Sequence, residues 1–302
     1  MRTFRGHRGF VQSLAFSPVG SLVASGASDG RVIVWDPLTG GIVYEAGVDG
    51  TDGENVGAVA FSPDGSFLAS GSHEGNVRVF CPAKGPVPIL NFTEQGRITA
   101  LAFSPDGKRL AWSSYPGWSA HSLHDSAIIA LERHNVSGLL FILRIAPDGQ
   151  TVAVAGTGPD ILLYDLYDTK APATPTKLTH GDRQGVWSLA YSPDGRSLAA
   201  ALAGGVQLWD LTANRLLDEW KDHDDVVTGI AISPDGSRLL TCSWDRTTRL
   251  YVFDPVTQSR GPLVGCYDWK VGRLFDVAIS PDSTLAVAGG DDGDYVVAWD
   301  IE

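Results

Sequence analysis

The sequence predicts an all-β protein in which seven four-stranded sheets form a closed ring. A turn motif recurs seven times along the chain, and each copy lies between short segments that are apolar throughout or alternate between apolar and polar residues. No segment shows sustained helical periodicity. With 302 residues, 43% of them hydrophobic, the chain can bury a large core.

The recurring turn is Ser-Pro-Asp-Gly or a close variant of it. The unchanged form begins at Ser62, Ser104, Ser192 and Ser233, and variants begin at Ser17, Ala146 and Ser280. These first residues are separated by 45, 42, 42, 46, 41 and 47 positions. Proline fixes φ at the first turn position and Gly, Asn or Asp tolerates the positive φ that follows, so the motif reverses the chain. A period in the low forties is typical of four short strands per unit in a circular array.

Each repeat is expected to contain four strands in a fixed order. The first two form a hairpin around the turn, over residues 14–25, 59–70, 101–112, 143–154, 189–200, 230–241 and 277–288. A third strand follows, as in 26–36, 71–80, 202–210, 242–252 and 289–300. A less regular fourth strand comes next, for example over 41–45, 87–92, 214–220 and 261–266. The hub strands are apolar on both faces because neighbouring sheets cover them.

The last repeat has room for three strands before Glu302. We expect residues 2–5 to supply the fourth strand, so that the first residues pair with the last repeat and close the ring. Closure removes the free sheet edges that make β proteins prone to aggregation. The prediction is a single seven-bladed domain over residues 1–302.

The motifs resemble those of a known family. The Gly6-His7 pair, the Ser-Pro-Asp-Gly turns and the Trp-Asp pairs at 35–36, 209–210 and 299–300 look like the WD40-repeat family of seven-bladed β-propellers, and the resemblance covers essentially the whole chain. It implies a hydrogen-bonded tetrad in each blade, made of a loop His, a second-strand Ser or Thr, a turn Asp and a third-strand Trp. The first repeat supplies His7, Ser25, Asp29 and Trp35, and the sixth supplies His223, Thr241, Asp245 and, in place of Trp, Tyr251.

Other repeats depart from the tetrad. The second has Ser70, Glu74 and Phe80, the third has Trp112 in place of the hydroxyl residue, and the fifth has Ala200 and Gly204 in place of Ser and Asp. A Ser-His-Asp group also suggests a hydrolase, which would need an exposed Ser and an oxyanion site. The family places this Ser in a strand with a Trp over it. We therefore interpret the tetrad as structural and predict no enzyme activity and no catalytic residues.

The resemblance also implies a binding face. Loops between blades and turns between second and third strands surround the mouth of the central channel. Residues expected there are Phe10, Asn55, His73, Arg97, Trp187, Val226, Trp244, Arg273 and Phe275. Trp187 and Phe275 occupy a position that other repeats fill with Gln12, Gly57, Thr99 and Thr228. Exposed aromatics near Arg are typical of protein interfaces. In the alternative interpretation the two rings pack on each other and plug the channel.

Composition and charge limit the partners. The chain has 23 Lys+Arg against 35 Asp+Glu, a net charge of -12, which argues against a nucleic-acid partner. It has no signal peptide and no run of about 18 apolar residues, so no membrane association is expected. Its three widely spaced cysteines favour a reducing cytoplasm. We predict a non-enzymatic, monomeric scaffold without cofactors that binds a protein or peptide at the channel mouth.

Two alternatives stay open. The channel mouth could bind a small molecule or a substrate, with His73 or Asp291 as the nearest titratable groups, or the chain could be the propeller module of a larger regulatory protein. A cluster of His121, His124, Asp125 and His134 has a spacing that metal ligands can have. Strand alternation places His121 and His124 on opposite faces, so we predict no metal site.

Overall fold

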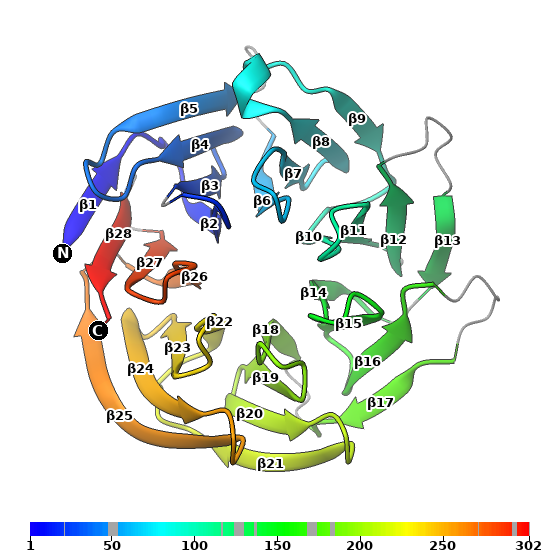
Figure 1. Cartoon of the computed structure of the whole chain (residues 1–302), viewed down its shortest axis with the longest axis vertical. Helices are drawn as coiled ribbons and strands as arrows, with labels where there is room; N and C mark the ends of the chain where they lie inside the picture. Colours follow the sequence, from blue (N-terminus) through cyan, green and yellow to red (C-terminus); the bar gives the residue numbers. More distant parts are fainter. Residues whose placement is uncertain are drawn as a thin grey trace.

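Seven four-stranded antiparallel sheets stand as blades around a central channel in the computed structural model (Figure 1). The structure describes residues 1–20, 22–47, 54–115, 117–123, 130–135 (backbone only), 138–167, 174–181, 185–270, 272–291 and 295–301. Both the all-β class and the count of seven blades, predicted from the repeat, are confirmed.

Blades 1 to 4 follow one another along the chain. Blade 1 contains β2 (Val11–Phe16), β3 (Val23–Ala27), β4 (Arg31–Trp35) and β5 (Ile42–Gly47). Blade 2 contains β6 (Val56–Phe61), β7 (Leu68–Ser72), β8 (Asn76–Phe80) and β9 (Leu90–Thr93), with the 3-10 helix η1 (Pro82–Lys84) before β9. Blade 3 contains β10 (Ala100–Phe103), β11 (Arg109–Ser114), β12 (Gly117–Ser122) and β13 (Ala130–Asn135). Blade 4 contains β14 (Leu140–Ile145), β15 (Thr151–Gly156), β16 (Asp160–Asp165) and β17 (Thr176–Thr179).

Blades 5 to 7 repeat the same unit. Blade 5 contains β18 (Val186–Tyr191), β19 (Ser197–Leu202), β20 (Gly205–Asp210) and β21 (Arg215–Trp220). Blade 6 contains β22 (Val227–Ile232), β23 (Arg238–Ser243), β24 (Thr247–Asp254) and β25 (Ser259–Asp268). Blade 7 contains β26 (Leu274–Ile279), β27 (Leu285–Gly290), β28 (Tyr295–Asp300) and, from the start of the chain, β1 (Arg2–Arg5). One strand of each blade lies nearest the channel (Figure 1). In blades 1 to 7 these inner strands are β2, β6, β10, β14, β18, β22 and β26.

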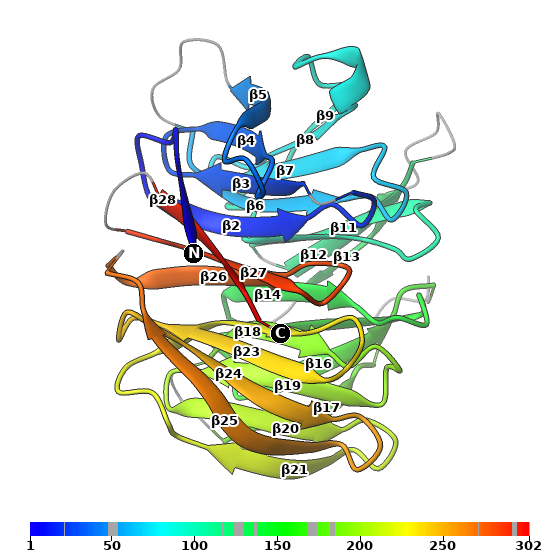
Figure 2. The ribbon, with the colours of Figure 1, turned by 60° about the vertical axis from the view of Figure 1, so that its left-hand side comes forward.

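The ring closes between the two ends of the chain. Strand β1 pairs antiparallel with β28, with Arg2 opposite Ala298 and Arg5 opposite Tyr295, and the two strands lie side by side in Figure 2. Phe4 of β1 is buried and stacks on Trp35 of blade 1, with 6.0 Å between ring centroids. The predicted closure by residues 2–5 is confirmed, and the pairing covers the outer edge of β28.

The turns work by the chemistry that the sequence indicates. In the second repeat the Ser62 hydroxyl donates to Asp64 at 2.6 Å, and Gly65 has φ of 70°. Hydrogen bonds from Ser62 and Ser66 lower the pKa of Asp64 to about 2. In the seventh repeat Ser283 replaces the glycine and still adopts φ of 62°. The turn is kept, although this backbone conformation is unfavourable for a residue with a side chain.

Neighbouring blades pack closely because small residues line their contact. Ala24, Val32 and Val34 of blade 1 form one buried cluster with Val56 and other side chains of blade 2. A Cβ added to Gly26 would collide with the Val56 side chain, so glycine lets the next hub strand approach. Within the part of the chain that the structure describes, no helix is long and apolar enough to cross a membrane.

Candidate functional site

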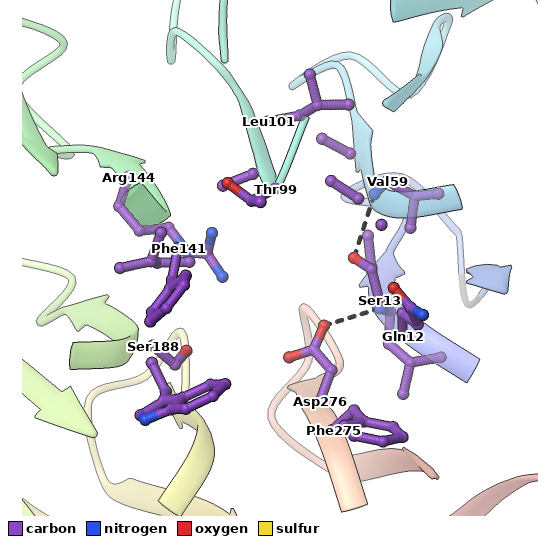
Figure 3. A pocket seen from close by; sticks show the side chains of 18 of the residues that line it. Gln12, Ser13, Val59, Thr99, Leu101, Phe141, Arg144, Ser188, Phe275 and Asp276 are labelled. Carbon is purple, nitrogen blue, oxygen red and sulfur yellow. Dashed lines mark hydrogen bonds between the residues drawn. The ribbon is translucent and has the colours of Figure 1, made fainter. Parts of the chain in front are cut away.

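The central channel contains a cavity of about 700 Å³ that hub strands line on all sides (Figure 3). The same register position, five residues before each turn, contributes a lining residue from every blade. These residues are Gln12, Gly57, Thr99, Phe141, Trp187, Thr228 and Phe275. Side chains as different as glycine and tryptophan occupy this position. The cavity is therefore aromatic on the side of blades 4, 5 and 7 and small or polar on the others.

Three aromatic rings contact one another at the mouth of the central channel. Phe141 and Trp187 stack with 4.9 Å between centroids and 24° between ring planes, and Trp187 meets Trp244 edge-to-face at 5.3 Å. The Arg273 guanidinium lies 5.5 Å from the Trp244 ring centroid. Arg273 also forms an ion pair with Asp291 at 2.7 Å, which holds its side chain in place. We call Phe141, Trp187, Trp244 and Arg273 the aromatic ladder.

The aromatic ladder differs from the expected pairing. Among the described residues, the ring partners of Trp187 are Phe141 and Trp244, so a plug made by Trp187 and Phe275 packing on each other is wrong. Phe275 lines the cavity from blade 7 instead. Sequence reasoning missed Phe141, although it lies at the same register position as Trp187 and Phe275. Aligning all seven repeats on their turns would have found it.

His73 and Arg97, also expected at the mouth, line the cavity and contact each other. Arg97 donates to His73 Nδ1 at 2.7 Å. Burial and the nearby Arg97 charge lower the pKa of His73 to about 4, so the imidazole is neutral at pH 7. The neutral His73 ring accepts a hydrogen bond from Arg97 but does not neutralise the positive charge of its guanidinium.

The other expected mouth residues lie just outside the cavity. The backbone N–H of Phe10 donates to Ser28 Oγ at 2.8 Å, and the backbone N–H of Asn55 donates to Glu74 Oε2 at 3.0 Å. The carbonyl of Val226 accepts from the backbone N–H of Trp244 at 3.0 Å. Phe10 is exposed. In blades 1, 2 and 6 these hydrogen bonds link the loop before the first strand to the turn between the second and third strands.

Polar hub residues join successive blades around the channel. Ser13 accepts a hydrogen bond from the backbone N–H of Val59 at 3.1 Å, and Asp276 accepts one from the backbone N–H of Leu14 at 2.8 Å. Thr99 donates to the carbonyl of Leu140 at 2.9 Å, and Thr228 makes the same bond to Leu274 at 2.8 Å. Ser13 and Asp276 occupy the same register position, and so do Thr99 and Thr228.

Two charged side chains face each other inside the cavity, and sequence reasoning missed both. Arg144 extends from blade 4 and Asp276 from blade 7 (Figure 3). Burial raises the pKa of Asp276 to about 6, although Arg144 and two backbone N–H groups act in the opposite direction. Burial also lowers the pKa of Arg144. Comparing the repeats at each register position would have singled out both residues.

The four predicted tetrad residues of blade 1 lie together. His7 Nδ1 lies 3.1 Å from both carboxylate oxygens of Asp29, and His7 Nε2 lies 2.7 Å from Ser25 Oγ. The Trp35 indole N–H donates to the same Ser25 oxygen at 2.7 Å. Burial alone would raise the pKa of Asp29, but hydrogen bonding and the charge of His7 lower it. Ser25 is fully buried, which leaves no space for a substrate at this hydroxyl.

Blade 6 brings three of its four predicted residues together. His223 lies 2.8 Å from Asp245 and 2.8 Å from Thr241. Tyr251 does not reach Thr241; its hydroxyl donates to Asp222 at 3.1 Å. Arg260 forms an ion pair with the same carboxylate at 2.7 Å and lies over the Tyr251 ring.

The suggested histidine cluster is not assembled in the described residues. His121 is buried on β12 and stacks on Trp112, with 4.4 Å between centroids and 10° between ring planes. His124, Asp125 and the side chain of His134 lie outside the described residues. Within the described ranges, no three His, Cys, Asp or Glu side chains come close enough to hold a metal ion.

A family model described as "WD domain, G-beta repeat" matches residues 1–36, 46–81, 174–210 and 214–251. The matches fall on blades 1, 2, 5 and 6, and the other three blades repeat the same four-stranded unit in the same ring. The chain belongs to the WD40-repeat family of seven-bladed β-propellers.

Curated relatives share parts of the chain. Protein groucho of Drosophila melanogaster is 33% identical over 108 residues, which are 35% of this chain and 14% of the relative. A protein named "Uncharacterized WD repeat-containing protein sll1491" of Synechocystis is 30% identical over 153 residues, 50% of this chain and 41% of the relative. The "Periodic tryptophan protein 2 homolog" of Neurospora crassa is 32% identical over 97 residues, 32% of this chain and 10% of the relative. The matched segments thus span less than half the length of each relative.

Proposed function

We propose that the protein is a non-enzymatic interaction scaffold and that a peptide or protein segment binds on the face around the channel mouth. The observation that carries this proposal is the aromatic ladder, whose Trp187 and Trp244 are only half-buried at the edge of the cavity. Aromatic residues and arginine are enriched among the interface residues that contribute most of the binding energy. Family membership supports the same class, because WD40 propellers act generally as protein-interaction scaffolds.

The geometry of the aromatic ladder suits an inserted side chain. Stacking on Phe141 and contact with Trp244 hold the Trp187 ring, so little side-chain entropy is lost when a partner covers it. Arg273 adds a planar cation beside Trp244 that can donate to backbone carbonyls of a bound segment. The partner segment would then cross the mouth from blade 5 to blade 7.

The test is affinity purification followed by mass spectrometry with wild type and two variants, Trp187→Thr and Phe275→Thr. Threonine is chosen because Thr99 and Thr228 occupy the same register position in blades 3 and 6. Tyr167→Ala is the matched control, since Tyr167 is an exposed aromatic that packs on Arg109 beside the turns of the opposite face. We expect a partner that is recovered with wild type and the control and lost with both variants. Equal recovery from all four proteins would remove the proposed face.

A second candidate function has its own observation, the cavity itself. Its volume of about 700 Å³ lies within the range of small-molecule pockets. It is lined by Trp187, Phe275 and titratable groups whose pKa values are shifted, His73 and Asp276. Such a combination of an apolar wall and a few polar groups favours a bound small molecule.

We also propose that the chain is one domain and a monomer in the cytoplasm. The pairing of β1 with β28 joins the two ends of the chain in one blade, which supports a single domain. Cys81, Cys242 and Cys266 are all free thiols, as expected in a reducing compartment. Light scattering at a mass near 32.1 kDa would support the monomer, and twice that mass would exclude it.

A further inference from the structure

Arg144 stands at a position where every other repeat has alanine. The register position two residues before each turn holds Ala15, Ala60, Ala102, Arg144, Ala190, Ala231 and Ala278. The architecture of the ring therefore needs no long side chain here. A guanidinium has five N–H donors, and Arg144 uses one in a hydrogen bond to the neighbouring carbonyl of Leu143 at 3.0 Å. The rest of the group is directed into the cavity (Figure 3).

The charge of Asp276 is also unnecessary for the ring. The register position four residues before each turn holds Ser13, Ala58, Ala100, Ile142, Ser188, Gly229 and Asp276. Ser13 makes the same contact to the next blade as Asp276 does, and it does so without a charge. The Asp276 carboxylate is half-buried in the cavity and loses part of its hydration, which destabilises the charged form. A neutral serine would avoid this destabilisation and keep the contact.

The two charges lie on opposite walls of one cavity. Figure 3 shows the Arg144 guanidinium and the Asp276 carboxylate turned toward each other across the open space. Among the described residues, the Arg144 guanidinium and the Asp276 carboxylate form no ion pair with each other. Open space of the cavity therefore lies between the two groups. Phe141 and Phe275 flank the two charged groups, and Trp187 belongs to the same lining. The other charged or titratable groups of the lining are His73, Arg97 and Tyr115.

We propose that this cavity binds a small amino-carboxylate with an aromatic or large apolar side chain. Its carboxylate would pair with Arg144, its ammonium group with Asp276, and its side chain would contact Phe141, Trp187 and Phe275. This proposal rests on the second function proposed above, binding of a small molecule in the channel.

The charge balance of the cavity selects this class over a plain carboxylate. A ligand with a carboxylate alone would place a second anion beside the half-buried Asp276, where like charges repel more strongly than in bulk water. A ligand with an amine alone would meet the same problem with Arg144. A molecule that carries both groups has no net charge and gives both Arg144 and Asp276 a partner, while hydrogen bonds to charged groups are among the stronger ones.

The test is isothermal titration calorimetry at pH 7.5, where Asp276, with a pKa of about 6, is mostly ionised. The probes are L-phenylalanine, 3-phenylpropanoate, which lacks the amine, and 2-phenylethylamine, which lacks the carboxylate. The variants are Arg144→Ala, the residue of the other six repeats, and Asp276→Ser, the residue of the first repeat. Both substitutions restore what the ring uses elsewhere, so the variants should fold, and thermal melting checks this. Arg215→Ala is the matched control, because Arg215 lies on the outer strand β21 with an exposed side chain.

We expect wild type and the control to bind L-phenylalanine more tightly than either analogue. Each variant should weaken L-phenylalanine binding roughly 10- to 100-fold, the range of a hydrogen bond to a charged group. The variant Asp276→Ser should no longer distinguish L-phenylalanine from 3-phenylpropanoate.

Tighter binding of 3-phenylpropanoate to wild type would overturn the amino-carboxylate class but keep a small-molecule site. Failure of all three probes would overturn the inference. The second proposed function is then judged separately by ligand-observed NMR with a general fragment set. A fragment that Phe275→Thr no longer binds would support the function, and the absence of any such fragment would end it.

Discussion

Blades 1 and 5 share strand order and a third-strand tryptophan, but they treat its indole N–H differently. In blade 1 the Trp35 N–H donates to Ser25 Oγ at 2.7 Å, within the network that His7 and Asp29 complete. In blade 5 Ala200 stands where Ser25 stands, and the Trp209 N–H is buried without a hydrogen-bond partner among the described residues. Both rings are almost completely buried, with 0% and 5% of their surface exposed.

The difference teaches that a blade of this ring keeps its fold without the tetrad, through strand pairing and apolar packing. Trp209 belongs to a large buried cluster that spans blades 3 to 5, with Val186, Leu189 and Leu198 among its members. A buried donor without a partner is destabilising by about 1–3 kcal/mol. The cluster of blade 5 evidently outweighs that loss. In blade 1 the tetrad adds to the packing and does not replace it.

Breaking the network of blade 1 is expected to have the largest effect. The substitution Ser25→Ala gives blade 1 the residue of blade 5 and leaves both the Trp35 N–H and His7 Nε2 without the hydroxyl. We expect the free energy of unfolding to fall by about 1–3 kcal/mol, measured by chemical denaturation. Thr176→Ala, at an exposed residue of the outer strand β17, is the control. A loss no greater than that of the control would show that the tetrad of blade 1 contributes nothing.

Building the missing hydroxyl into blade 5 is expected to have a smaller and opposite effect. The substitution Ala200→Ser places an acceptor where Ser25 lies in blade 1, and the Trp209 N–H gains a partner. A typical net hydrogen bond would raise the free energy of unfolding by roughly 0.5–1.5 kcal/mol. The double variant Ala200→Ser, Trp209→Phe removes the donor and should lose that gain. An equal gain in both variants would contradict the hydrogen-bond explanation.

The smallest effect is expected in the acid range. The pKa of Asp29 is lowered in the folded protein, so this carboxylate stabilises the fold above the pKa of an unfolded Asp, about 4, and the contribution disappears as pH falls. Blade 5 has Gly204 at that turn and makes no such contribution. Unfolding measured from pH 5 to pH 3 should therefore show a shallower loss of stability for Asp29→Asn than for wild type, by roughly 1 kcal/mol or less. An Asp300→Asn control, at an exposed carboxylate, should follow wild type.

The strands nearest the hub were easier to predict than the outer ones. Residues 2–5 are an exception: they form the outermost strand of blade 7 as expected, because the last repeat leaves the edge of β28 open for them. The fourth strand of blade 6 runs over Ser259–Asp268, longer than the expected 261–266, and that of blade 2 starts at Leu90 instead of residue 87. Outer strands face solvent on part of their surface, so their apolar pattern is weak and their ends are poorly marked.

The candidate site was predictable in its position but not in its contacts. Trp187 and Phe275 line the channel as the repeat register implies, and Phe141 follows from the same register. Their partners could not be predicted, because rings at equivalent positions can turn toward either neighbour or into the channel. Trp187 turns to Phe141 on one side and to Trp244 on the other.

The sequence by itself determined the number of blades, the turns between strands and the strand that closes the ring, because turn chemistry and apolar alternation act over a few neighbouring residues. Only the tertiary structure decided that Trp187 contacts Trp244 and that Arg144 faces Asp276 across one cavity. The side chains in these pairs come from different blades, and their separation depends on how closely seven sheets pack when the ring closes. That packing is a property of the whole chain, so no local pattern encodes it.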